Sequence, residues 1–297
     1  ESVLAQNYNN WEYHIIDDGS EDNSSEYLNT FNKLSNFYIY NLPYNSGQPN
    51  ALYSSNVFNK ITGDLVILLD SDDCLLNNSF STIINDFKSY NTSEILSINY
   101  EITEDPNIKD TILLNNSTKY SSSELLKDHH PLHTNLNGFR DYLCVYKREY
   151  WISRNKYFIS PKHWYVSKYD ININLDFEEV YSDSILLFMN LDNDSVTKGA
   201  NFKKYAPITL FTRKYIYENY SKKMDKKLLQ YTFFSLLMTS LTFANNKKYV
   251  IKLIFNNLKI FFSNLKKMII VCFLLILPSL FNYKLKYLIK TKRLKRQ

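Results

Sequence analysis

The sequence predicts an α/β protein in which strands and helices alternate over residues 1–202, followed by a basic helical region over residues 203–297. Two apolar, β-branched runs, Trp11–Ile16 and Leu65–Leu69, end in turn residues, as buried strands do. Helix-like segments separate them, and this alternation is typical of a parallel sheet with crossover connections. The 297 residues, 44% of them hydrophobic, suffice for a sizeable core and exclude a disordered chain.

The individual elements follow from local sequence signals. We expect the end of a helix at Glu1–Ala5, a strand at Trp11–Ile16, a helix capped by Asp22 or Asn23 and reaching about Leu34, a strand at Phe37–Tyr40, a helix at Gly47–Asn59 and the strand at Leu65–Leu69. Further on, Gly138–Tyr146 is expected to be a strand that leads into a helix near Arg148. Gly and Asn in the turns between these segments support the boundaries.

Acidic residues follow two of the predicted strands. Asp17 and Asp18 follow the first, and Asp70, Asp72 and Asp73 follow the most apolar one. Ligands of such sheets bind outside the carboxyl ends of the strands, so we expect the five carboxylates near one edge. Because close carboxylates repel unless a cation neutralises them, they predict Mg²⁺ or Mn²⁺ held together with substrate phosphates. The alternative is that these Asp-rich loops serve only as turns and helix caps.

Three ordered motifs resemble the start of a family 2 glycosyltransferase with the GT-A fold. They are SVLAQNYNNWEYHIIDDGSEDNS, NSGQPNA and TGDLVILLDSDD. The resemblance implies a Rossmann-like mixed sheet flanked by helices in residues 1–202. It also implies that the donor is a nucleotide-diphosphate sugar, and among these a UDP-sugar is the donor we expect. Mn²⁺ or Mg²⁺ would bridge the diphosphate to the DxD-type motif. Carried over to this sequence, the nucleotide-binding residues are Asp17, Asp18, Gly47 and Asp72, and the metal-site residues are Asp70, Asp72 and Asp73.

Two departures from the family pattern concern the nucleotide site. The family begins with a strand and a Pro-x-Tyr-Asn-like turn that lines the base pocket, and this chain starts after them, so we expect it to be truncated at its N-terminus. Family members also often carry a basic residue where this sequence has Asn50-Ala51-Leu52-Tyr53. A charge contact to the nucleotide is therefore expected to be missing.

The resemblance also suggests a catalytic base for inverting transfer. Such a base must reach the acceptor hydroxyl, whose proton it removes. The segment Glu178–Leu187 resembles the family's Glu-Asp motif, in which an acidic residue opens a helix, so Asp183 is the predicted base. Asp183 as an ordinary acid at a helix N-terminus is the alternative, and Glu178 and Glu179 are the fallback. Trp164 is a candidate platform for the acceptor sugar, or else a packed aromatic.

Histidine and cysteine offer little sign of a zinc site. Asp128, His129, His130 and His133 form one cluster, but no second cluster completes a ligand shell. The three cysteines have neither disulfide-framework nor CxxC spacing, which favours a reducing compartment.

Charge divides the chain sharply. Lys and Arg minus Asp and Glu is 14 − 28 = −14 for residues 1–202 and 21 − 2 = +19 for residues 203–297. The longest apolar run, Met268–Phe281, has 14 residues, whereas spanning a bilayer takes about 20. Lysines on both sides of it predict a helix at the surface of an anionic membrane rather than across it. A helical bundle with a solvated Lys face is the alternative. Nucleic acid is not expected, because no nucleic-acid-binding motif accompanies the charge.

Together these features predict a metal-dependent, inverting glycosyltransferase that adds a single sugar, since no Gln-x-x-Arg-Trp sequence of a processive synthase is present. A glycan or lipid-linked acceptor in cell-envelope polysaccharide or lipooligosaccharide synthesis is expected, with the enzyme cytoplasmic and peripheral at the inner face of the cell membrane. Two alternatives remain. One is a glycosyltransferase-like binding or scaffold protein without turnover, and the other is a nucleotidyltransferase of related fold.

Overall fold

The computed structural model describes residues 1–90, 95–131, 142–156, 163–190, 202–242, 244 and 246–276. The chain forms two compact units. Unit 1 consists of Glu1–Leu125 and His130–Leu191, and unit 2 consists of Leu126–His129 and Asp192–Gln297. The units therefore change over at Leu191, before the boundary after Phe202 that charge suggested.

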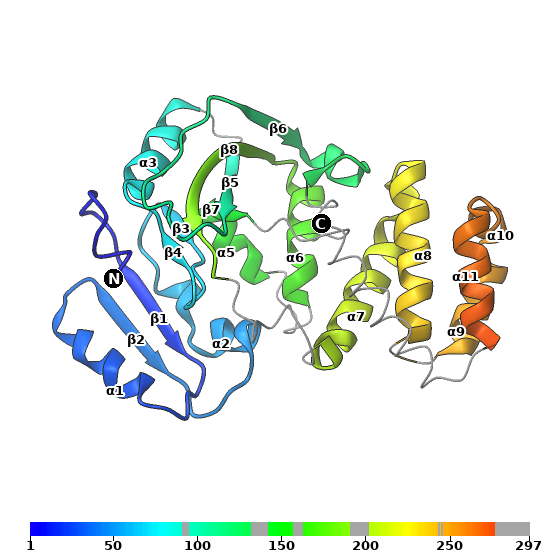
Figure 1. Ribbon diagram of the computed structural model, residues 1–297, viewed down its shortest axis with the longest axis horizontal. Helices are drawn as coiled ribbons and strands as arrows, with labels where there is room; N and C mark the ends of the chain where they lie inside the picture. The colour runs from blue at the N-terminus through cyan, green and yellow to red at the C-terminus, as the bar shows by residue number, and fades with distance from the viewer. Residues whose placement is uncertain are drawn as a thin grey trace. The chain divides into compact units, whose positions relative to one another are not determined.

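Unit 1 begins with a small parallel sheet (Figure 1). Strands β1 (Tyr13–Asp17) and β2 (Phe37–Asn41) pair in parallel from Tyr13 opposite Phe37 to Asp17 opposite Asn41. Helix α1 (Ser24–Asn29) and a 3₁₀ turn (Thr30–Lys33) connect them, as the strand–helix–strand pattern predicted. The Asp22 carboxylate accepts a hydrogen bond from the Ser24 amide, 2.9 Å away, where the helix begins.

A larger mixed sheet forms the rest of unit 1. Its strands are β3 (Leu65–Ile67), β4 (Cys74–Leu75), β5 (Ile95–Thr103), β6 (Ser117–Ser121), β7 (Leu143–Lys147) and β8 (Glu178–Phe188), in the order β3-β7-β5-β8-β4, with β6 on β8. Strands β5 and β8 are parallel, whereas the other pairs are antiparallel. The prediction that β3 continues a parallel sheet is wrong, because β3 pairs antiparallel with β7, a strand far along the chain.

The structure decides three further expectations, on the strand at Gly138–Tyr146, the helix near Arg148 and the segment around Asp183. The predicted strand at Gly138–Tyr146 is β7, which begins at Leu143; residues 138–141 lie outside the described residues. The helix predicted near Arg148 is α5 (Arg148–Lys156), which is confirmed. The segment around Asp183 is the long strand β8 and not the start of a helix, so that prediction is wrong. Backbone pairing with β4, β5 and β6 explains the extended conformation, and most side chains of β8 are buried whichever face they lie on.

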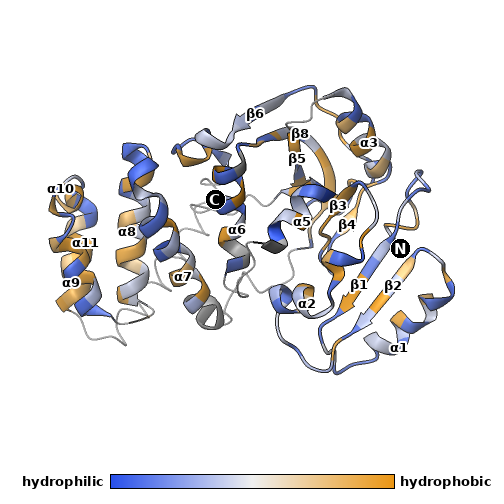
Figure 2. Cartoon of the chain, turned by 180° about the vertical axis from the view of Figure 1, so that it is seen from behind, coloured by the Kyte–Doolittle hydropathy of each residue, from blue (hydrophilic) through white to orange (hydrophobic). Residues whose placement is uncertain are grey.

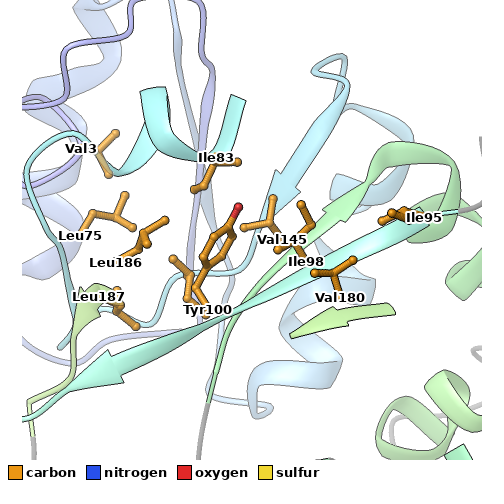
Figure 3. Close-up of a cluster of buried hydrophobic side chains, with 11 residues drawn as sticks. Val3, Leu75, Ile83, Ile95, Ile98, Tyr100, Val145, Val180, Leu186 and Leu187 are labelled. Atoms are coloured by element: carbon orange, nitrogen blue, oxygen red, sulfur yellow. The ribbon is translucent and has the colours of Figure 1, made fainter. Parts of the chain in front are cut away.

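One face of the larger sheet carries an aliphatic core (Figure 3). Ile98 and Tyr100 of β5 are fully buried there, against Ile83 of helix α3 (Ser79–Ser89). The Tyr100 hydroxyl donates to an Asp86 carboxylate oxygen at 3.0 Å. Burial raises the pKa of Asp86 and of Tyr100, so the Tyr100 hydroxyl keeps its proton and is the donor of this half-buried hydrogen bond.

The opposite face is covered by helices α5 and α6 (Trp164–Leu175). Trp151 of α5 stacks on Phe58, from the 3₁₀ turn Val57–Asn59, at 5.2 Å between ring centroids. Leu52 of helix α2 (Gln48–Ser54) belongs to the same cluster. This second core ties the segment after β2 to the larger sheet.

A buried polar layer lies on the same side of the sheet. Glu179 of β8 is 3% exposed and forms an ion pair with Lys168 of α6 at 3.3 Å. Asn172 and Tyr181 donate hydrogen bonds to the two Glu179 oxygens. Burial alone would raise the pKa of Glu179, but the Lys168 ammonium, His130 and these hydrogen bonds outweigh it and lower the pKa. The charge pair is therefore satisfied, although both groups are out of water.

Side chains rather than strand ladders join β1 and β2 to the larger sheet. The Glu12 carboxylate, just before β1, accepts hydrogen bonds from the amides of Thr62 and Gly63 at 2.5 and 3.0 Å. Arg148 donates to the carbonyl oxygen of Thr62 at 2.9 Å. Gln6 donates to the Leu76 carbonyl oxygen at 3.0 Å. These contacts set the position of the first strands against the second sheet.

Unit 2 is helical, as its sequence predicted. Its helices are α7 (Phe202–Tyr220), α8 (Lys226–Thr242), α9 (Lys247–Phe255), α10 (Leu258–Phe261) and α11 (Leu265–Ile276). Phe233, Leu236 and Leu237 of α8 are fully buried at the centre of its core. The Lys- and Arg-rich end beyond Ile276 lies outside the described residues.

Within the described part of the chain, no helix has both the length and the apolar character needed to cross a bilayer.

The buried ion pair yields a stability prediction. We expect Lys168→Met to lower the free energy of unfolding near neutral pH by about 3–5 kcal/mol, because it leaves the Glu179 charge buried without a cation. In this variant burial dominates and raises the pKa of Glu179, so the folded state takes up a proton as pH falls. The deficit relative to wild type should therefore shrink between about pH 7 and pH 5.

Urea denaturation at a series of pH values measures this. The double variant Lys168→Met/Glu179→Gln is the matched control, because it removes both charges and should recover most of the loss. In the wild type the pKa of Glu179 is lowered, so the stability that the ionised carboxylate contributes is complete above the ordinary pKa of a glutamate. That contribution is lost only as pH falls below about 4. A single-variant deficit that stays constant with pH would contradict this account.

Candidate functional site

The loop after β1 is built around Asp17 and Gly19. Asp17 is buried, and its carboxylate accepts hydrogen bonds from the Ser20 amide at 2.9 Å and from the Ser25 hydroxyl. Burial would raise the pKa of Asp17, but these hydrogen bonds lower it. Because both carboxylate oxygens are used inside the loop, the structure gives Asp17 a role in holding the loop to α1. A direct contact of Asp17 with a nucleotide stays a prediction from the resemblance.

Asp18 joins this loop to the turn before α2. One of its carboxylate oxygens accepts from the Ser46 amide and the Ser46 hydroxyl, both at 2.9 Å, and the other accepts from the Gly47 amide at 2.6 Å. Gly47 has φ +86 and stands at the N-cap of α2, a conformation that glycine adopts without strain. The predicted residues Asp18 and Gly47 are thus in direct contact.

The next residue along, Gln48, reaches the second acidic loop. Its side-chain amide donates to an Asp70 carboxylate oxygen at 2.8 Å. Three consecutive residues, Ser46 to Gln48, therefore bridge the loop after β1 and the loop after β3. The carboxyl ends of these two strands come together, although the strands belong to different sheets.

Of the three acids in the second loop, Asp72 alone lacks a partner among the described residues. Asp70 accepts from Gln48, and an Asp73 carboxylate oxygen accepts from the Asn190 amide at 3.3 Å. Asp72 is exposed and makes no hydrogen bond or ion pair with any part of the chain that the structure describes. It is the carboxylate available to a ligand.

The predicted metal site of Asp70, Asp72 and Asp73 is not formed as a set of three ligands. In the described ranges, no group of three His, Cys, Asp or Glu side chains is arranged to hold a metal ion. The residues do fit a cation of the Mg²⁺ kind, which binds through one or two carboxylates and takes its other oxygens from substrate phosphates and water. Asp72 meets that requirement, with Asp70 beside it in the loop.

The sequence matches the family model described as glycosyl transferase family 2 over residues 1–150. The chain belongs to glycosyl transferase family 2. The matched segment contains both acidic loops and the turn that bridges them, so the motifs that carried the resemblance coincide with the site in the structure.

Two further comparisons extend this family 2 assignment. Poly-beta-1,6-N-acetyl-D-glucosamine synthase of Staphylococcus epidermidis is 34% identical over 87 residues. These residues are 29% of this chain and 21% of that protein, so the match spans about a fifth of the relative's length.

Solved structures of S. aureus TarS share the fold. The crystal structure of TarS 1-349 superposes with a TM-score of 0.51 at 13% identity, covering 82% of this chain and 67% of that one. The crystal structure of TarS gives 0.52 at 12% identity, covering 82% and 40%. The GT-A fold expected from the sequence, with a mixed sheet, flanking helices and a helical C-terminal region, is confirmed.

Asp183, the predicted base of this family 2 chain, lies apart from the acidic loops. It is exposed in the middle of β8, where its amide donates to the Asn116 carbonyl oxygen at 3.1 Å. The loop containing Asp73 lies at the C-terminal end of β8, where Cys74 pairs with Phe188. Phe188 stands five positions after Asp183, which is roughly 16 Å along an extended strand.

The helix that precedes β8 does not carry the expected acid either. Helix α6 has no acidic residue in its first turn, and His163 stands at its N-cap. The fallback residue Glu179 is buried in its ion pair with Lys168, and Glu178 lies 3.8 Å from Lys119. The base therefore stays a prediction from the resemblance.

The remaining candidates are placed as follows. His130 is buried, with its ring edge-on to Tyr120 and Tyr181 at 4.9 and 5.5 Å, which is an aromatic packing role. His133 lies outside the described residues, as does the side chain of Trp164. Cys74, Cys144 and Cys272 are free, as their spacing indicated.

Two site residues were not singled out from the sequence. Ser46 and Gln48 make the bridge between the acidic loops, and both belong to the NSGQPNA motif. In the sequence, both are polar residues that flank a glycine after a predicted strand. Their role could be assigned only once the structure showed Asp18 and Asp70 as their partners.

The loop geometry predicts a strong effect of one methyl group. Gly19 has φ +73, and a Cβ there would lie 2.5 Å from the Tyr44 carbonyl carbon. We expect Gly19→Ala to lower the free energy of unfolding by about 2–4 kcal/mol, through backbone strain and steric overlap. Urea denaturation measures the loss.

Gly63→Ala is the matched control. A Cβ at Gly63 has its nearest neighbour at 3.5 Å, an ordinary contact, and its φ is outside the left-handed range. It should change stability by less than about 1 kcal/mol. Equal effects of the two substitutions would refute the steric explanation.

Proposed function

We propose that the chain is a glycosyltransferase that moves a single sugar from a nucleotide-diphosphate sugar, with a UDP-sugar as first choice, to an acceptor hydroxyl. The observation that carries the proposal is one available carboxylate, Asp72, beside the contacts that join Asp18 to Asp70 through residues 46–48. Family membership over residues 1–150 supports the same chemistry.

Asp18 organises the nucleotide end of the proposed site. A carboxylate offers about four lone-pair positions, and three are used by Ser46 and Gly47. The position left on the oxygen that faces Gly47 suits an N–H donor such as a pyrimidine base. Asp18 therefore both fixes the turn and presents an acceptor to the base.

Asp72 serves the diphosphate end. A bound Mg²⁺ or Mn²⁺ supplies positive charge that stabilises the negative charge of a nucleoside diphosphate leaving group. Asp72, with Asp70 as the second carboxylate, would hold that cation. Gln48 keeps Asp70 in place through its 2.8 Å hydrogen bond, so the turn bound by Asp18 also positions the metal side of the site.

We propose an acceptor of the glycan or lipid-linked class, used in cell-envelope polysaccharide or lipooligosaccharide synthesis. The similarity of 87 residues to a protein named as a polysaccharide synthase supports this class. A peripheral position of the enzyme at the anionic inner face of the cell membrane belongs to the same proposal, supported by the charge of +19 over residues 203–297. There it would meet a lipid-linked acceptor.

Isothermal titration with UDP, GDP and CDP, with and without Mn²⁺, tests the donor site. We expect metal-dependent binding of one nucleotide, and at least a 10-fold loss of affinity in Asp72→Asn, because the variant removes the charge of the carboxylate that no other described residue engages. Glu149→Gln is the charge-matched control on an exposed residue of α5 and should bind as wild type.

Absence of binding for all three nucleotides, with and without metal, would overturn the transferase proposal. A binding or scaffold protein without turnover would then be the better account.

The role of Asp183 is tested by measuring the turnover rate of the sugar donor whose nucleotide binds. Loss of a catalytic base costs about 10²- to 10⁴-fold in rate. From its place in the middle of β8 we expect Asp183→Asn to reduce turnover by less than about 10-fold, with nucleotide affinity unchanged. Asp176→Asn, an exposed residue with positive φ that asparagine tolerates, is the control.

If Asp183→Asn lowers the turnover rate by about 10³-fold or more and binds nucleotide normally, our expectation is contradicted and Asp183 is the base.

A further inference from the structure

Helices α9, α10 and α11 of unit 2 expose a row of large apolar side chains on the side away from α8. We call this row the outer face; its members are Ile251, Phe255, Leu258, Phe262, Leu265, Ile269, Ile270, Phe273 and Ile276, with exposed fractions from 37% to 82%. All three helices pack on α8, and Figures 1 and 2 place them together on one side of it. Their outward side chains therefore share one surface.

Helical periodicity makes the outer face continuous along α11. Leu265, Ile269, Phe273 and Ile276 recur every three or four residues and lie on one side of the helix. Val271 and Leu274 lie on the other side and are buried in the core of unit 2. An α-helix that is apolar on both sides is suited to burial on both sides, yet one side of α11 faces away from the core.

The shorter helices repeat the pattern. Ile251 and Phe255 of α9 are spaced four residues apart, as are Leu258 and Phe262, which span α10. Figure 2 colours much of α9 and α11 orange, which marks hydrophobic residues. Exposed large apolar side chains gathered on neighbouring helices mark an interaction site in soluble proteins.

The charges around the outer face are of one sign. Residues 247–276 contain six lysines and no aspartate or glutamate. Exposed Lys248, Lys252, Lys259 and Lys266 alternate with the apolar members of the outer face along the chain. Their long side chains allow the apolar stems to follow an apolar surface while the ammonium groups remain in a polar layer.

We propose that the outer face binds the surface of an anionic lipid bilayer, with α9, α10 and α11 lying in the plane of the interface. The apolar side chains would enter the acyl boundary and the lysines would meet the lipid phosphates. A second copy of the chain is the less suitable occupant, because a two-fold interface would bring two identical basic surfaces together. The inference rests on the membrane location in the proposed function and assigns the residues that produce it.

Vesicle co-sedimentation tests the outer face without any nucleotide. The probes are vesicles of phosphatidylcholine alone and vesicles with about 30% phosphatidylglycerol. We expect at least 10-fold tighter binding of the wild-type chain to the anionic vesicles, falling as salt is raised. Phe255→Ser/Phe273→Ser should weaken that binding at least 10-fold, because it removes two of the exposed aromatic side chains.

Matched controls separate surface chemistry from fold. Tyr27→Ser/Tyr44→Ser removes two aromatics of unit 1 that are 59% and 70% exposed and should bind vesicles as wild type. Lys259→Gln/Lys266→Gln should weaken binding to the anionic vesicles at least 10-fold, at about 1 kcal/mol for each lysine, whereas Lys33→Gln/Lys88→Gln should bind them as wild type. Circular dichroism confirms that each variant is folded.

Three results would overturn the inference. They are no vesicle binding by the wild type, unchanged binding by Phe255→Ser/Phe273→Ser, and light scattering that finds a dimer which this variant dissociates. Nucleotide titration of the same variants is independent of lipid. A donor site that works without vesicle binding would refute the outer face alone, and vesicle binding without nucleotide binding would refute the transferase function alone.

Discussion

The acceptance of three hydrogen bonds by the Asp18 carboxylate is the constraint around which unit 1 is organised at its functional edge. It fixes the turn at Ser46 and Gly47, and the next residue, Gln48, then holds Asp70. Two strands that share no ladder, β1 and β3, are thereby brought to one place. Charge–amide hydrogen bonds are stronger than neutral ones, which suits them to this linking role.

Behind the larger sheet, the ion pair of Lys168 with Glu179 gives helix α6 a defined position on β8. Apolar packing alone tolerates small shifts between a helix and a sheet, whereas a buried charge tolerates none that would break its contacts. Asn172 and Tyr181 complete the acceptor positions of Glu179. Specific polar contacts, rather than strand pairing alone, therefore position the elements of unit 1.

Much of the first 70 residues followed from local signals. Trp11–Ile16 and Phe37–Tyr40 gave β1 and β2, and the acidic loops were recognised with their turn. Longer-range features were not accessible in this way. The antiparallel partner of β3 lies about 80 residues along the chain, and the polar run at Ser182, Asp183 and Ser184 concealed the strand period of β8, which tertiary pairing enforces. The burial of Asp17 and the occupation of Asp70 likewise depended on partners that no spacing identifies.

The presence of one unengaged carboxylate, Asp72, bears on the order in which ligands would assemble. Asp72 and Asp70, of which Asp70 already accepts a hydrogen bond from Gln48, offer a divalent ion few of the oxygens it needs, so the chain by itself should scarcely retain the ion. Under the proposed function, cation and nucleoside diphosphate would arrive as one complex, and each would strengthen the other's binding by the same factor. Occupancy would then follow the cellular supply of the metal-bound nucleotide sugar rather than that of the metal.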